Sequence, residues 1–191
     1  MKKINDILNI PESWEDITIE QLKKMKNLKD STSAEAQIEL IKLFNTDIDI
    51  MNIDFASILQ AITSIYDVLS DTPKPVKSDG SFTVDEVVYK LKDIDNIDFS
   101  TFLDFQSLSG GDNEWEKIQN LGLILSLLTE DKPTDDVKEF ADVIEKNVDV
   151  ITATSLLLFF SEKLISYLQN TQIYSQYMEQ MTKNKKERII D

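Results

Sequence analysis

The sequence predicts a mainly α-helical fold: a helical bundle of two lobes that share a repeated pattern, with one small β-hairpin and a long C-terminal helix. Apolar residues recur at the three- and four-residue spacing of amphipathic helices along most of the chain. Only four of the 191 residues are Gly and four are Pro, so few helix-breaking residues interrupt this spacing. The polar and apolar order of residues 4–28 also recurs without a gap at residues 84–108, an offset of 80 positions.

The 80-residue repeat is one of pattern and not of identity. Only 2 of its 25 aligned pairs are identical: Ile17 with Ile97, and Leu28 with Leu108. In each copy an apolar anchor and an acidic turn precede a helix cap and a helix. We therefore expect an N-terminal helical lobe over residues 1–70 and a C-terminal lobe over residues 82–191. Whether the halves arose by duplication stays open.

Three helices are expected in the N-terminal lobe. Thr18 is placed to cap the first, and Gln21 at the third helical position completes a capping box. The apolar spacing predicts a second helix over about residues 34–44. Asp54 caps a third helix over residues 55–69, whose broad apolar face predicts a central position in the fold.

Residues 71–81 are rich in Pro, Ser and Asp, and this composition predicts a linker between the lobes. The next segment, residues 82–91, contains two β-prone runs on either side of Asp85 and Glu86. That arrangement is typical of a β-hairpin with a two-residue turn.

Four helices are expected after the hairpin. Asp98 caps the first of them, and the second is expected to continue without a break to Leu128. A short helix over about residues 135–145 precedes the last and longest, over about residues 149–183.

The last helix is the predicted binding element. Its first half is apolar nearly all round, and its second half narrows to an apolar stripe with Tyr and Met, which protein interfaces favour. A helix that packs along its own domain is the alternative that this pattern leaves open. The predicted partner-binding residues are Leu157, Phe160, Leu164, Leu168, Tyr174, Tyr177, Met178 and Met181.

Composition argues against most chemistry. The chain has no Cys and no His, which removes disulfides, thiolate nucleophiles, imidazole bases and most zinc sites. Two segments, 47–49 and 93–95, begin like calcium loops, but both lack the sixth-position glycine and have Met51 or Ile97 at the fifth position. Their twelfth positions are Ile58 and Asp104. We expect no catalytic, cofactor or metal site, and a hydrolase built on two carboxylates is a distant alternative.

Charge and hydropathy limit the partners. A formal net charge of −15 repels nucleic acid and anionic membranes, and it favours a basic protein partner. The longest apolar run, residues 156–160, is far shorter than the ~18 residues that span a bilayer. No secretory signal follows Met1, because Asn5 and Asp6 interrupt the apolar run. A soluble intracellular protein without membrane or nucleic-acid partners is expected.

Residues 10–22 carry the phrase proline, x, serine, tryptophan, acidic, x, isoleucine, threonine. This phrase resembles the opening of small, mostly helical proteins of tailed bacteriophages, described as tail assembly chaperones or accessory virion components, including those of crAss-like phages. Residues 88–91 with 97–104, and the Leu-Phe-Phe core at 158–160, also resemble these proteins. The resemblance covers most of the chain, and its motifs are short.

The resemblance implies a function in tail or neck assembly, as an assembly chaperone or as a virion component. Its partners would be a long helical tape-measure-like protein, neighbouring ring or neck proteins, or a second copy of the chain. The expected location is the host cytoplasm or the virion. The acidic charge supports an alternative from another class: an inhibitor or nucleic-acid mimic that binds a basic host protein.

Overall fold

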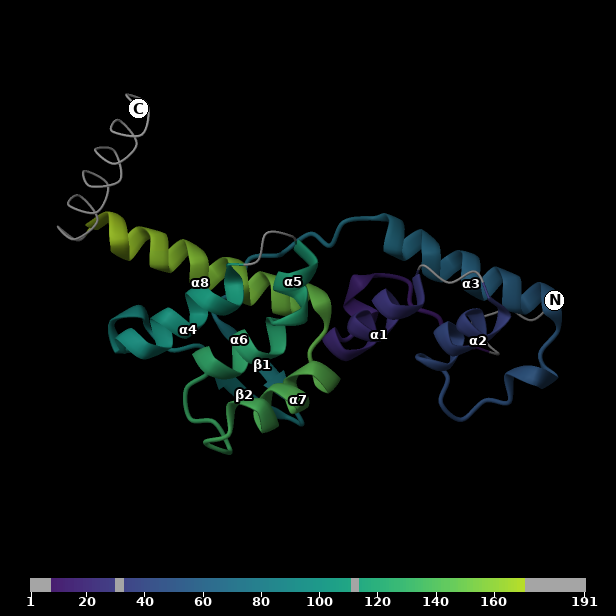
Figure 1. Ribbon diagram of the computed structural model, residues 1–191, viewed down its shortest axis with the longest axis horizontal. Coiled ribbons are helices and arrows are strands. Elements are labelled where there is room, and N and C mark those ends of the chain that lie inside the picture. The colour runs from purple at the N-terminus through teal and green to yellow at the C-terminus, as the bar shows by residue number, and fades with distance from the viewer. Residues whose placement is uncertain (1–7, 30–32, 111–113, 171–191) are drawn as a thin grey trace, which may run out of the picture.

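The computed structural model confirms the mainly helical fold, with one antiparallel hairpin and a long C-terminal helix. It describes residues 8–29, 33–110 and 114–170. Within these ranges lie eight α-helices and three 3-10 helices. The molecule is elongated, with α2 and α3 toward one end and α4 and the end of α8 toward the other (Figure 1).

The elements follow one another in the predicted order. The first part of the chain forms η2 (Trp14–Asp16), α1 (Ile19–Lys29), α2 (Ala34–Lys42), η3 (Ile50–Asn52) and α3 (Phe55–Ser70). The second part forms β1 (Ser81–Val84), β2 (Val87–Lys90), η4 (Ile94–Asn96), α4 (Phe99–Ser109), α5 (Glu114–Gln119), α6 (Leu121–Leu128), α7 (Val137–Asn147) and α8 (Val150–Asn170).

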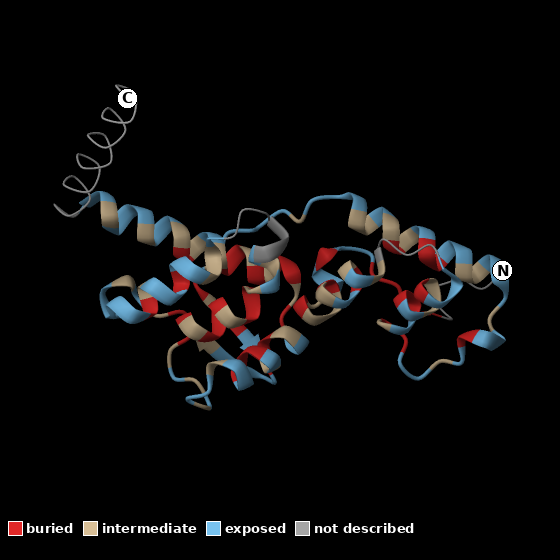
Figure 2. Ribbon diagram, in the orientation of Figure 1, coloured by how far each residue is buried: buried red, intermediate tan, exposed pale blue. Residues whose placement is uncertain are grey.

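Two sequence expectations were wrong. The helix expected to run unbroken to Leu128 is two helices, because Asn120 between α5 and α6 donates its side-chain amide to the carbonyl of Leu108 at 2.9 Å. The third helix, α3, is not central. It packs against α2 and lies at the outer end of the molecule, so part of its apolar face meets solvent (Figures 1 and 2).

The predicted helix caps are confirmed. Thr18 and Gln21 form the capping box, with backbone-to-side-chain hydrogen bonds of 2.9 and 3.2 Å. Asp54 accepts a hydrogen bond from the backbone N–H of Ser57, and Asp98 accepts one from Thr101. Each cap satisfies a donor that the first turn of a helix would otherwise leave unpaired.

A unit of 3-10 helix, Ile, polar cap and α-helix occurs three times. The three α-helices of this unit are α1, α3 and α4. Their Ile and cap residues are Ile17 and Thr18 for α1, Ile53 and Asp54 for α3, and Ile97 and Asp98 for α4. In each copy the N–H of the Ile donates to the carbonyl of the first residue in the 3-10 helix. The copies before α1 and α4 are the two halves of the 80-residue pattern, and the copy before α3 lies between them.

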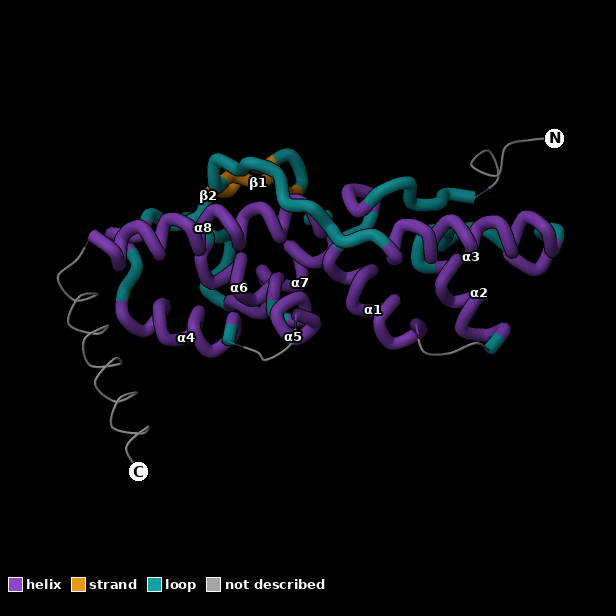
Figure 3. The backbone as a smooth tube through the Cα atoms, turned by 90° about the horizontal axis from the view of Figure 1, so that it is seen from above, coloured by secondary structure: helices purple, strands orange, loops and turns teal. Residues whose placement is uncertain are grey.

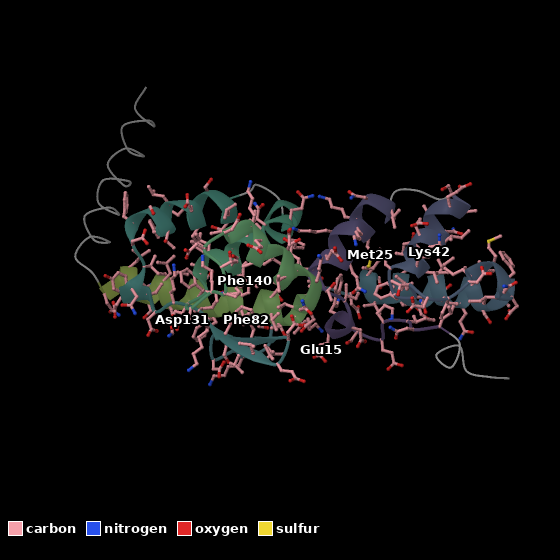
Figure 4. The ribbon with its side chains drawn as sticks, turned by 90° about the horizontal axis from the view of Figure 1, so that it is seen from below. Glu15, Met25, Lys42, Phe82, Asp131 and Phe140 are labelled. Carbon is pink, nitrogen blue, oxygen red and sulfur yellow. The ribbon has the colours of Figure 1, made fainter. Side chains whose placement is uncertain are left out.

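Two apolar clusters form the core, and segments distant in the sequence join them. The first cluster gathers side chains from η2 to α3, and the second gathers side chains from the hairpin to α8. Ile19 of α1 nevertheless belongs to the second cluster, and Val150 and Ile151 of α8 belong to the first. Figure 4 shows the labelled Met25 among the first group of helices, and Phe82 and Phe140 among the second.

A β-bridge holds together the two helix starts that contribute side chains to each other's cluster. Thr18 pairs with Asp149 in antiparallel fashion. The N–H of Ile19 donates to the carbonyl of Val148 at 3.1 Å, and the N–H of Val150 donates to the carbonyl of Ile17 at 2.9 Å. The starts of α1 and α8 are thus held together by backbone bonds.

An ion pair supports the same junction. The ammonium of Lys23 on α1 contacts Oε1 of Glu145 on α7, and these side chains are 27% and 13% exposed. Gly122 on α6 makes room for the carboxylate, because a Cβ at that position would collide with the Glu145 side chain. Three helices therefore meet around one partly buried salt bridge.

The hairpin is as predicted and covers α7. Val84 pairs with Val87 across the turn, and Phe82 pairs with Tyr89. The Tyr89 ring lies 5.0 Å from that of Phe140 on α7, so aromatic packing holds the sheet to the helix.

The segment before the hairpin is held against α8. The N–H of Val76 donates to the hydroxyl of Ser155 at 2.9 Å, and Gly80 packs on the ring of Phe159 with no space for a side chain. Figure 3 shows this segment running alongside α8.

The hairpin turn stores backbone strain. Asp85 and Glu86 have φ of 47° and 67°, the left-handed region that two-residue hairpin turns require and that favours glycine. We expect Glu86→Gly to raise the free energy of unfolding by about 0.5–1 kcal/mol, measured by thermal unfolding followed by circular dichroism. Glu86→Ala is the matched control, since it removes the charge and keeps the strain. Equal stability of the two variants would contradict this account.

Candidate protein-binding surface on α8

Helix α8 begins inside the core. Asp149 caps it, accepting hydrogen bonds from the N–H and the hydroxyl of Thr152 at 2.8 and 2.6 Å. The buried residues lie mainly in its first half: Val150, Ile151, Ala153, Ser155, Leu156 and Phe160. This apolar half therefore serves the fold.

The second half of α8 is largely exposed. Ile165 and Tyr167 have 54% and 43% of their surface in solvent, and Leu158, just before the middle of the helix, has 45%. Leu158 and Ile165 lie on one side of the helix, and Tyr167 lies on the opposite side. Figure 2 shows the change from buried to exposed along this helix. Lys163 lies 4.7 Å from the centre of the Phe159 ring and 3.4 Å from a carboxylate oxygen of Asp93, so it anchors the helix to η4.

The structure separates the predicted binding residues into three groups. Phe160 is 2% exposed and packs edge-on against Phe105 at 4.9 Å, inside the second cluster. Leu157, Leu164 and Leu168 are half-buried, and the first two pack against that cluster. The remaining four lie outside the described residues: Tyr174, Tyr177, Met178 and Met181. The exposed Leu158, Ile165 and Tyr167 were not predicted.

An apolar pocket of about 390 Å³ lies beside the first half of α8. Leu157 lines it together with Trp14, Met25 and Leu121, so both clusters contribute to its wall. The indole N–H of Trp14 donates to the carbonyl of Asp71 at 3.1 Å, which fixes the rim. The pocket can accept an apolar side chain of a partner.

A groove of about 570 Å³ lies between α8 and residues 75–78. Its wall on α8 includes the apolar Leu158 and Phe159 and the charged Glu162 and Lys163. The exposed Leu158 therefore borders this groove.

The acidic side chains and the length of α8 bear on two other kinds of site, a metal site and a membrane span. Within the described ranges, no group of three or more acidic side chains could hold a metal ion. α8 is long and apolar enough to cross a membrane by length and composition alone, a test that core helices also pass. One third of its most apolar window, 33%, is buried inside the structure.

Two exposed phenylalanines also escaped prediction. Phe55 and Phe99 are the first residues of α3 and α4, and they are 74% and 73% exposed. A second repeat, offset by 44 positions, marks both of them. Residues 49–59 and 93–103 are identical at seven of eleven positions, and both begin Asp-Ile-x-Asn-Ile-Asp-Phe. This signal is stronger than the 80-residue pattern.

Comparisons of the chain with protein-family models, with curated proteins and with solved structures found no match.

Proposed function

We propose that the chain is a protein–protein interaction module of a tailed bacteriophage. It acts in tail or neck assembly, as an assembly chaperone or as a structural component of the virion. The observation that carries the proposal is the exposed apolar face of α8 formed by Leu158 and Ile165. The phage setting rests on the sequence resemblance of residues 10–22 and of the later segments.

The α8 surface suits a helical partner. Leu158 and Ile165 are seven residues apart, so they lie two turns apart on one side of the helix. Apolar side chains at this spacing pack into the groove of another helix, as in helix-in-groove recognition. A long tape-measure-like helix or a helix of a ring protein offers such a groove.

A second candidate function rests on the net charge of −15. An acidic inhibitor or nucleic-acid mimic would bind a basic host protein through carboxylates. Salt separates the two functions, because charge pairing between exposed groups weakens steeply with ionic strength and apolar packing does not.

The test uses the tagged full chain in infected cells. We expect the wild-type chain to capture a phage tail or neck protein, identified by mass spectrometry, and to retain it in high salt. Leu158→Ser with Ile165→Ser should abolish capture, because it removes the exposed apolar face without touching the core. Truncation after Asn170 should also abolish capture or self-association and leave the fold intact.

Val88→Ser is the matched control, since Val88 is apolar and 62% exposed but lies on the hairpin. Equal capture by the α8 variant and the control would refute a role for α8. Capture lost in high salt would favour the acidic inhibitor. Presence of the chain in purified particles would identify a virion component, and presence only in lysate would identify a chaperone.

A further inference from the structure

The two copies of the 44-residue repeat expose the same pair of apolar side chains. Phe55 and Leu59 on α3 are 74% and 45% exposed, and Phe99 and Leu103 on α4 are 73% and 47% exposed. Residues four apart on a helix lie on one face, so each pair forms a small apolar patch over the first two turns. We call these patches the α3 pair and the α4 pair.

Local folding explains the shared cap residues but not these pairs. The Asp cap and the Ser or Thr three residues later hold the helix start in both copies. The apolar residues that flank the cap, Ile53 and Ile58 in the first copy, stand at the positions of a hydrophobic staple.

An exposed aromatic ring at the first position of a helix neither caps the helix nor packs in the core. Three other helices begin with a large apolar residue that is buried: Ile19 of α1 and Val150 of α8 are 0% exposed, and Leu121 of α6 is 1% exposed. Phe99 stacks on Phe102 at 6.5 Å and still stays in solvent. The same unusual exposure at both equivalent positions indicates a shared role outside the fold.

The chain segments that carry both pairs are acidic. Residues 43–73 and 93–110 contain no Lys or Arg, and they contain five and four Asp respectively. Lys163 of α8 lies 3.4 Å from a carboxylate oxygen of Asp93, at the start of the second segment. Hydrogen bonds from Ser57 lower the pKa of Asp54, and those from Thr101 and Ser100 lower the pKa of Asp98 to about 2, so both carboxylates stay charged near neutral pH.

The pairs lie far apart. α3 begins at one end of the elongated molecule, and α4 begins near the opposite end (Figures 1 and 3). One partner pocket therefore cannot cover both of them.

We propose that the α3 pair and the α4 pair are equivalent binding sites through which one copy of this chain joins two copies of the same partner protein. Each partner copy presents an apolar pocket for the Phe and Leu, with a rim of Lys or Arg that meets the Asp carboxylates. A second copy of this chain is a poor occupant, because a net charge of −15 opposes self-association of acidic ends. The bridge uses residues other than those of α8 and goes beyond the proposed function.

The test is site-specific photo-crosslinking of the full chain in infected cells, the same cells as in the capture experiment. Benzoylphenylalanine replaces Phe55 or Phe99 in the full chain, and the crosslinked peptides are mapped by mass spectrometry. Gln60 and Asp104 are the matched control positions, since they are equivalent in the repeat, exposed, and turned away from the pairs. We expect both test positions to crosslink to the same segment of one protein, one that carries Lys or Arg, and the controls to crosslink at least 10-fold less.

Native mass spectrometry of the chain with that protein then counts the copies bound. We expect two copies for the wild type and one fewer for Phe55→Ser and for Phe99→Ser, with unchanged thermal unfolding because both side chains are exposed. The proposal is overturned by crosslinks to two different proteins, by crosslinks to this chain itself, by none above the controls, or by an unchanged copy number in both variants. The same count is made for the variant with the α8 substitutions. Binding of two partner copies by that variant would show that the α3 and α4 pairs act independently of the α8 surface.

Discussion

Phe160→Ala is expected to lower the free energy of unfolding by about 3–5 kcal/mol, the largest effect of any variant considered. The ring is 2% exposed and packs edge-on against Phe105 at 4.9 Å, so its removal leaves a cavity between α8 and α4. Urea unfolding followed by circular dichroism measures the change. Phe160 is one of the predicted partner-binding residues, so the result also decides whether it stabilises the core or binds a partner.

Tyr167→Ala is the matched control, an aromatic truncation on the same helix at a position that is 43% exposed. It should change the free energy of unfolding by less than about 0.5 kcal/mol. The converse result, a stable Phe160→Ala protein that no longer binds, would move Phe160 from the core to the binding surface.

Lys23→Met is expected to lower the free energy of unfolding by about 2 kcal/mol, because it leaves the Glu145 carboxylate, 13% exposed, without its cation. The double variant with Glu145→Leu should recover most of the loss, since two apolar side chains of similar volume replace a partly buried ion pair without an unpaired charge. Chemical unfolding of the four proteins of this double-mutant cycle gives the coupling energy directly.

Lys42→Met supplies the comparison for a surface pair. Lys42 and Glu39 lie 2.9 Å apart but are 50% and 56% exposed, so breaking them should cost less than about 0.5 kcal/mol. If Lys23→Met costs no more than Lys42→Met, the pair between α1 and α7 does not support the junction.

Most helix starts could be predicted because their signals are local. Thr18, Asp54 and Asp98 each cap a helix and are each followed three residues later by the residue that completes the cap. The hairpin was equally accessible, because its two β-prone runs and its two-residue turn are contiguous in the chain.

The failures involve contacts between distant residues. The break at Asn120 depends on the carbonyl of Leu108, twelve residues away, and no local pattern shows it. The first half of α8 is apolar on every side, so the sequence could not tell that Phe160 faces the core while Leu158 does not. α3 looked central because Phe55 and Leu59 were counted with its buried face.

The binding surface was predicted only in part for the same reason. Periodicity located the correct helix but not the side that remains uncovered, which depends on where η4 and residues 75–78 lie. The exposed phenylalanines had a signal in the 44-residue repeat, which identity would have revealed and polar patterning did not.

The β-bridge between Thr18 and Asp149 has a consequence for synthesis of the chain. The two residues are separated by 131 positions, so a ribosome that adds about 5–20 residues per second makes Asp149 roughly 7–26 seconds after Thr18. Until then the first cluster lacks Val150 and Ile151, and the nascent chain presents an unfinished apolar surface. Translation therefore sets the earliest time at which the first helices can reach their native packing.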